Sequence, residues 1–294
     1  MSNWLALDDS EGRRLPDRFS TVMDAHVHLF PDPLFQAIWR WFDEFAWPIR
    51  YKLTSPQIIE FLSSRGIDRI LGLHYAHRPE MARYLNLYMA ELCEQYPQVI
   101  GVATVFPGES DATAIMEEAF GMGLVGIKLH AHVQCFAMDD PAMREIYRSC
   151  ADHNKALIMH VGREPKNPNY PYKRDPYETC DANKLECVLK NYPDLRICVP
   201  HLGADQFDQY QRLLECYNNL WVDTAMALAD YLPNLVPPCL ADLRADRVMF
   251  GTDFPNIPYA WDREIQQLET LNLPEDFLTG LLYRNASEFL SIKT

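Results

Sequence analysis

The stretch LVGIKLHAHVQCFAMDDPAMREIYRSCADHNKALIMHV, residues 124–161, contains the repeating unit that decides the fold. Two apolar runs, 124–130 and 156–161, are rich in Val, Ile and Leu and are typical of buried strands. Between them, residues 140–154 place apolar side chains three or four positions apart, which indicates an amphipathic helix. The stretch therefore predicts two parallel strands joined by a helix.

The same alternation of strand and helix runs along most of the chain. Strands are predicted at 22–28, 69–74, 99–105, 124–130, 156–161, 195–201, 219–224 and 247–252. Helices are predicted at 55–66, 79–97, 111–123, 140–154, 181–193 and 205–219. Eight strands alternating with helices in 294 residues favour an α/β (β/α)₈ TIM barrel, formed by one domain over residues 1–294. A doubly wound open sheet shares these signals, but no GxGxxG follows the first strand to support a dinucleotide-binding version.

Two segments interrupt this rhythm. Residues 30–54 form an aromatic-rich insertion after the first strand, and residues 162–178 form a loop rich in Pro and Tyr after the fifth. Loops that follow the strands of a barrel lie on its functional rim, so both segments are expected there. The insertion either caps the site or buries a contact between two copies, and we expect a homodimer or larger homo-oligomer.

Composition excludes several classes of protein. With 27 basic and 41 acidic residues the net charge is −14, which argues against nucleic-acid binding and against anionic membranes. We find neither a signal peptide nor an apolar run of 18 residues, so no membrane span is predicted. The eight cysteines are scattered without a CxxC pair, which favours reduced thiols and a cytoplasmic location.

Polar side chains gather at the ends of the predicted strands, where a barrel brings them to one mouth. They are His26 and His28 on the first strand, Lys128 and His130 on the fourth, His160 on the fifth, His201 on the sixth and Asp253 after the eighth. This convergence, more than any single residue, predicts a functional site that acts on a small molecule.

The residue types suit a metal site. His26 and His28 are two positions apart on a strand and so share a face. With His160 and Asp253 they offer nitrogen and oxygen ligands for one divalent ion, with Zn²⁺ first and Mn, Fe or Co as alternatives. Such an ion activates a water molecule, whose proton Asp253 would take and pass to the leaving group. His201 would contact that water or polarise the substrate.

Other polar residues have less specific interpretations. Lys128, His130 and Arg163 are candidates to bind the substrate, the two cations through a carboxylate. Lys128 could instead form a strand-end ion pair or, once carboxylated, support a second metal. The remaining histidines are expected to be peripheral: His74, His77, His132 and His153.

Five short motifs together resemble the amidohydrolase superfamily, in particular its amidohydrolase-related (amidohydrolase 2) branch. They are DAHVH at 24–28, GIKLH at 126–130, IMHVG at 158–162, VPHLG at 199–203 and FGTDFP at 250–255. The resemblance implies a metal-dependent TIM barrel. It also implies that four residues are ligands and that His201 is a catalytic histidine; the ligands would be His26, His28, His160 and Asp253.

The resemblance leaves the reaction open between classes. Our leading hypothesis is a metal-dependent hydrolase of a small lactone, amide or ester that bears a carboxylate. The alternative is a non-oxidative decarboxylase, a carboxy-lyase, of a small aromatic or unsaturated acid. Several decarboxylases of this branch begin with Glu-x-His, so the intact His-x-His favours hydrolysis. A catalytically silent barrel that acts as a binding protein is the third hypothesis.

Overall fold

Parallel strands form the interior of the molecule, of which a computed structural model describes residues 9–162, 179–230 and 238–292. The strands occur in the sequence order that the apolar runs predict, and each pairs in parallel with the next in two series, β1 to β3 and β4 to β8. They are β1 (Met23–His28), β2 (Arg69–Leu73), β3 (Val99–Gly101), β4 (Gly126–His130), β5 (Ala156–His160), β6 (Ile197–Val199), β7 (Leu220–Asp223) and β8 (Val248–Met249).

Backbone contacts join the two series at both seams. Beyond β3, Ala103 forms a parallel bridge to Ile127 of β4, and its carbonyl accepts a hydrogen bond from the Lys128 amide at 2.7 Å. Beyond β8, the Phe250 carbonyl accepts a hydrogen bond from Ala25 of β1 at 2.9 Å, and Phe254 bridges to Val27. The strands therefore follow one another around a ring, and the predicted TIM barrel is confirmed.

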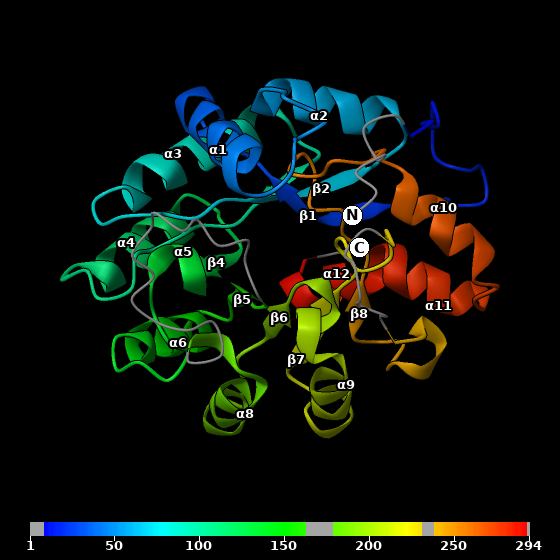
Figure 1. Ribbon diagram of the computed structural model, residues 1–294. Helices are drawn as coiled ribbons and strands as arrows, with labels where there is room; N and C mark the ends of the chain where they lie inside the picture. Colours follow the sequence, from blue (N-terminus) through cyan, green and yellow to red (C-terminus); the bar gives the residue numbers. More distant parts are fainter. Residues whose placement is uncertain (1–8, 163–178, 231–237, 293–294) are drawn as a thin grey trace.

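Helices surround this ring of strands, as Figure 1 shows. They are α1 (Asp32–Phe45), α2 (Ser55–Ser64), α3 (Ala82–Gln95), α4 (Ala112–Gly121), α5 (Ala131–Gln134), α6 (Met143–Asp152), α8 (Ala182–Asn191), α9 (Phe207–Cys216), α10 (Arg263–Thr270), α11 (Glu275–Thr279) and α12 (Asn285–Leu290). Short 3₁₀ segments occupy His201–Gln206 and Leu240–Asp242, and a π-helical turn occupies Gly280–Arg284. The helical periodicity of the sequence did not predict the last three helices, which lie within residues 263–290.

The core has two layers, one between strands and helices and one inside the ring. The inner layer contains Met23, Leu71 and Trp221 from the strands, together with Phe289 and Leu290 of α12. The Phe289 ring contacts that of Trp221 at 5.4 Å between centroids, and its side chain is fully buried. Helix α12 therefore closes the end of the barrel opposite the carboxyl ends of the strands.

A β-bulge in β1 turns the two histidines of DAHVH inward. The register advances by three residues in β1, from Asp24 to Val27, while β2 advances by only two. Before the bulge Ala25 belongs to the inner layer, and after it Val27 packs outward against the helices. His26 and His28 can therefore both face the interior, although simple alternation from Ala25 would have pointed them the other way.

The structure also shortens three predicted strands. They are the predicted strands at 99–105, 195–201 and 247–252, which appear as β3, β6 and β8. Past β3 and β8 side chains also bind the backbone: the Thr104 amide donates to Asn86 Oδ1 at 2.8 Å, and the Thr252 amide to Asp24 Oδ1 at 3.1 Å. These irregular segments lie at the carboxyl ends of the strands and shape the site.

Candidate metal centre and its cavity

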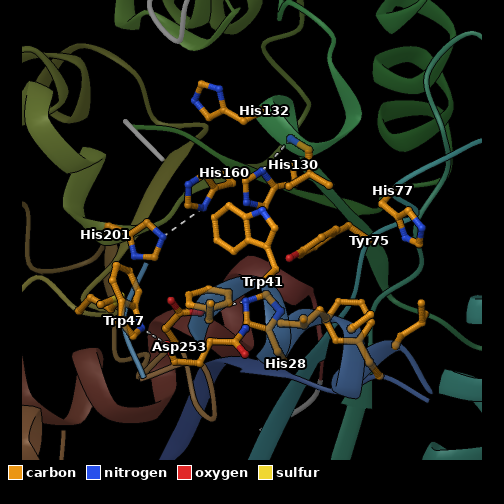
Figure 2. Close-up of a pocket in the computed structure, with 18 of the residues that line it drawn as sticks. His28, Trp41, Trp47, Tyr75, His77, His130, His132, His160, His201 and Asp253 are labelled. Carbon is orange, nitrogen blue, oxygen red and sulfur yellow. Dashed lines mark hydrogen bonds and ion pairs between the residues drawn. The ribbon is translucent and has the colours of Figure 1, made fainter. Parts of the chain in front are cut away.

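One cavity of about 470 Å³ opens at the carboxyl ends of the strands. Its lining residues follow β1, β2, β4, β5, β6, β7 and β8, as the strand-end argument predicts. Figure 2 shows ten of them facing the same space: His28, Trp41, Trp47, Tyr75, His77, His130, His132, His160, His201 and Asp253. The convergence of distant parts of the sequence is therefore present in the fold.

Three of the four predicted ligands form a cluster, of which His28 and Asp253 line this cavity and His26 is buried beside them. His26, His28 and Asp253 each offer an atom within 4.8 Å of the other two. The Asp253 Oδ1 atom lies 2.9 Å from His28 Nε2 and 3.5 Å from His26 Nε2. Gly251 permits this approach, because a Cβ atom there would lie only 2.8 Å from that of His26.

This donor set fits a divalent ion. Ligands at about 2.0–2.1 Å from a tetrahedral zinc are separated from one another by about 3.3 Å, close to the two distances that Asp253 makes. Two imidazoles and one carboxylate are also the mixture of nitrogen and oxygen donors that zinc, manganese and iron accept. His160 lies beyond this cluster, beside His201.

Asp223, at the end of β7, holds the far side of His26. Its Oδ2 atom is 2.8 Å from His26 Nδ1, and both side chains are 1% exposed. Its Oδ1 atom accepts the amides of His201 at 3.0 Å and Ala225 at 3.1 Å. Asp223 was missed in the sequence, although it is the acidic residue near the end of the predicted seventh strand and the strand-end rule would have found it.

His201 and His160 face each other across the cavity wall. The His201 Nε2 atom lies 3.2 Å from His160 Nδ1, and the His201 Nδ1 atom lies 2.8 Å from the Ala225 carbonyl. The His160 ring also stacks on that of His130, with centroids 4.0 Å apart. The structure thus places His160, His201 and His130 together, next to the cluster of candidate ligands.

The backbone is strained at two of these residues. His201 has a φ of 59° and Asp253 a φ of 64°, in the left-handed region that non-glycine residues rarely adopt. Each is held by hydrogen bonds: the Asp253 amide donates to the His26 carbonyl at 2.9 Å, and the His201 amide donates to Asp223. Strain of this kind persists only where surrounding contacts fix it, and it is concentrated at functional sites.

Burial and neighbouring charges favour the neutral form of His26, His160 and His201 and the anionic form of Asp253. Desolvation lowers the pKa of His26 and His160 well below the ordinary value, and the Lys128 charge lowers both further. Burial also lowers the pKa of His201, with a contribution from His160. Burial alone would raise the pKa of Asp253. The hydrogen bond from His28 and the electrostatic interaction with His26 outweigh it and hold the pKa of Asp253 below its usual range. Neutral imidazole and ionised carboxylate are the forms that ligate metals.

The three residues predicted to bind substrate have different positions. His130 lines the cavity and makes a T-shaped contact with Tyr75, with ring centroids 4.8 Å apart. Lys128 is fully buried and is not among the residues that line the cavity. Arg163 lies outside the described residues.

The insertion after β1 forms a wall of the cavity. Helix α1 contributes Leu34, Ile38, Trp41 and Phe42, and Trp47 follows it. The Trp47 indole donates to the Asn256 carbonyl at 2.9 Å, which ties the insertion to the segment after β8. Of the two roles considered for this insertion, capping the site is the one that these contacts support.

Two of the histidines expected to be peripheral, His77 and His132, line the cavity, so that expectation was wrong for them. The His132 Nε2 atom lies 2.6 Å from the Gly162 carbonyl. His74 is fully buried and bonds Asn86, and His153 follows the last residue of α6 as its C-cap. Periodicity gave no signal for His132, because short α5 directly follows β4 and turns it toward the cavity.

The fold and the histidine–carboxylate cluster define a metal-dependent TIM-barrel enzyme. Residues 23–292 match the amidohydrolase family described as Amidohydrolase (Amidohydro_2), and the chain belongs to that family. No helix in the described ranges combines the length and the apolar character that crossing a membrane requires.

Several known proteins are similar to this chain. A 2-amino-3-carboxymuconate-6-semialdehyde decarboxylase from Dictyostelium discoideum is 26% identical over 248 residues, which cover 72% of this chain and 67% of that protein. An uncharacterised TIM-barrel protein from Bordetella bronchiseptica superposes with a TM-score of 0.71 at 20% identity, covering 92% of this chain and 98% of that one. A 5-carboxyvanillate decarboxylase from Novosphingobium aromaticivorans, in complex with manganese and 4-hydroxy-3-methoxy-5-nitrobenzoic acid, gives 0.67 at 18% identity over 96% of this chain and 100% of that one.

Proposed function

We propose that this chain is a metal-dependent, non-oxidative decarboxylase of a small aromatic or unsaturated acid. The observation that carries the proposal is the lining of the cavity, where imidazoles and the Asp253 carboxylate share one space with the aromatic side chains of Trp41 and Trp47. Similarity to a curated decarboxylase supports the same reaction. The proposal replaces hydrolysis, which the His-x-His motif favoured, as the leading hypothesis.

The apolar wall suits the loss of CO₂. Decarboxylation breaks a carbon–carbon bond, releases CO₂ and leaves a proton in its place on the same carbon. Trp41, Phe42 and Trp47 present apolar surface to the cavity that Asp253 also lines, so the carboxylate of an acid bound against them would lose part of its solvation. In an unsaturated or aromatic acid, protonation of this carbon before the bond breaks would let the electron pair of that bond enter the π system, and the flat group would stack on these side chains.

Residues of the chain would hold the metal and move the proton. We assign His26, His28 and Asp253 as ligands, with His160 as the fourth, to one divalent ion; zinc suits the donors, and manganese is the alternative that a structural relative contains. When bound, the ion supplies positive charge that orients the substrate's oxygen atoms. Asp253 and His201 both line the cavity, and we assign them the transfer of a proton to the carbon that loses CO₂.

The test measures CO₂ release from metal-loaded protein over a panel of small aromatic and unsaturated carboxylic acids. We expect turnover of at least one acid, loss of that turnover on chelation, and recovery when zinc or manganese is restored. The Asp253→Asn variant, loaded with the same metal, should lose at least about 100-fold in kcat, the range typical of a group that transfers a proton. Turnover of lactones or amides with no acid consumed would instead support hydrolysis.

A further inference from the structure

Residues 223–226, the last residue of β7 and the three that follow it, contact two histidines of the site and are called here the β7 exit segment. Asp223 Oδ2 lies 2.8 Å from His26 Nδ1, and the Ala225 carbonyl lies 2.8 Å from His201 Nδ1. We propose that this segment sets the tautomers of His26 and His201, and through His201 that of His160, so that both candidate ligands carry no hydrogen on Nε2. The inference rests on the proposed function only in that these rings serve a metal.

The hydrogen bonds around Asp223 fix the tautomer of His26. Oδ1 already accepts two backbone amides, from His201 and Ala225, and the ionised carboxylate can only accept. The third contact, from His26 Nδ1 to Oδ2, is therefore satisfied when Nδ1 carries the hydrogen. A neutral imidazole protonated on Nδ1 has its lone pair on Nε2, the atom that lies 3.5 Å from Asp253.

Two consecutive hydrogen bonds, from His160 to His201 and from His201 to the Ala225 carbonyl, also fix the tautomer of His160. A carbonyl oxygen only accepts, so the bond to Ala225 requires a hydrogen on His201 Nδ1. In the neutral ring His201 Nε2 is then an acceptor, and His160 Nδ1, at 3.2 Å, donates to it. His160 is thereby also protonated on Nδ1. Burial favours neutrality for both rings, because it lowers the pKa of each.

Asp223 and Ala225 therefore have a positioning role. In water a neutral imidazole exchanges its hydrogen between the two ring nitrogens. A metal can bind Nε2 only in the fraction of rings in which that atom carries no hydrogen. The β7 exit segment is itself held, since the Met226 amide donates to buried Glu264 Oε1 at 2.6 Å and the Ala227 amide to the Thr224 carbonyl at 2.9 Å. The two acceptors are therefore fixed before any ion arrives.

The first test reads the tautomers directly. Two-bond ¹H–¹⁵N spectra of chelator-treated, full-length protein, with rings assigned by single His→Gln variants, distinguish a protonated from an unprotonated ring nitrogen. We expect His26, His201 and His160 to be protonated on Nδ1. Spectra with the hydrogen of His26 or His160 on Nε2 would overturn the proposal, whatever reaction the enzyme catalyses.

The second test changes the acceptor. In Asp223→Asn the amide oxygen must stay opposite the two backbone donors, so the NH₂ group faces His26 Nδ1 and drives the hydrogen to Nε2. We expect metal affinity, measured by competition with a chromogenic chelator, to fall about 10- to 100-fold, as for other partners of metal-ligating histidines. The His26 signals should show the opposite tautomer, while those of His160 remain unchanged.

Asp262→Asn provides the matched control. Asp262 is also a buried carboxylate that accepts a backbone amide, from Gly12 at 2.8 Å, but it lies away from the cavity. Its substitution should leave the dissociation constant of the metal unchanged. If Asp223→Asn folds, as urea unfolding would show, and retains wild-type metal affinity and the wild-type tautomer, Asp223 has only a structural role. Failure of the proposed decarboxylation would leave both readouts intact, so the two proposals fail separately.

Discussion

Acidification should destabilise this fold through His74, a fully buried histidine outside the cluster of candidate ligands. Its Nε2 atom bonds Asn86 Oδ1 at 3.2 Å, and burial lowers its pKa from 6.5 to about 4. The unfolded chain binds a proton below about pH 6.5 that the native protein refuses until about pH 4. Stability is therefore complete above pH 6.5 and lost as the pH falls toward 4. At about pH 5 the loss due to this ring amounts to about 2 kcal/mol.

Urea unfolding of wild type and His74→Gln, at about pH 7 and about pH 5, isolates this contribution. Glutamine keeps a donor for Asn86 but does not titrate, so its packing cost appears equally at both values of pH. We expect the variant to lose about 2 kcal/mol less than wild type on acidification. An equal loss in both proteins would refute the reasoning, because His74 would then not be held neutral by burial.

Three further predictions concern the aromatic side chains of the cavity, helix α12 at the closed end of the barrel, and the metal. Trp41→Ala should raise KM by up to about tenfold, because an aromatic contact contributes about 0.5–1.5 kcal/mol to binding, and it should also lower kcat, because water would reach the substrate carboxylate. Steady-state kinetics on an acid that is turned over would show both effects, and an unchanged KM would remove Trp41 from the binding surface. Phe289→Ala should lower the free energy of unfolding, measured in urea, by about 3–5 kcal/mol. A loss below about 1 kcal/mol would contradict the packing of α12 against the inner layer of the barrel. Restoring the metal to chelator-treated protein at about 100 times its dissociation constant should add about 2.7 kcal/mol of stability, whereas His28→Ala should gain much less.

The strand-end residues could be predicted from the sequence because the geometry of a barrel brings the carboxyl ends of all its strands together. Once the apolar runs are placed in order, His28, His160 and Asp253 must meet at one mouth. The five motifs that resemble the amidohydrolase family encode the same geometry, and the amino-acid sequence is therefore sufficient to indicate the family.

The bulge in β1 could not be predicted from the sequence. An extra residue between Asp24 and Val27 changes which face His26 presents, and it is fixed by pairing with β2 and by the hydrogen bonds of Asp24 to Thr252. Asp24 and Thr252 are 228 positions apart, so no local pattern contains this contact. The same holds for His132, whose direction depends on the turn of α5.

The sequence motifs did not decide the reaction. The His-x-His pair favoured hydrolysis, whereas similarity to a decarboxylase favours the alternative. A His-x-His pair specifies metal ligands, which hydrolases and decarboxylases share. What separates the two reactions is the environment above the metal, and here α1 covers the cavity with Leu34, Trp41 and Phe42. The aromatic insertion was visible in the sequence, but its side chains could have served a contact between copies just as well.

The most direct test of the account follows isotopes through one turnover by metal-loaded enzyme. With an acid from the panel in ²H₂O and H₂¹⁸O, we predict release of CO₂ and one deuterium on the carbon that carried the carboxylate. The organic product should contain no ¹⁸O. A product that carries ¹⁸O in a new carboxyl or hydroxyl group, formed without CO₂, would show hydrolysis and would contradict the proposed decarboxylase.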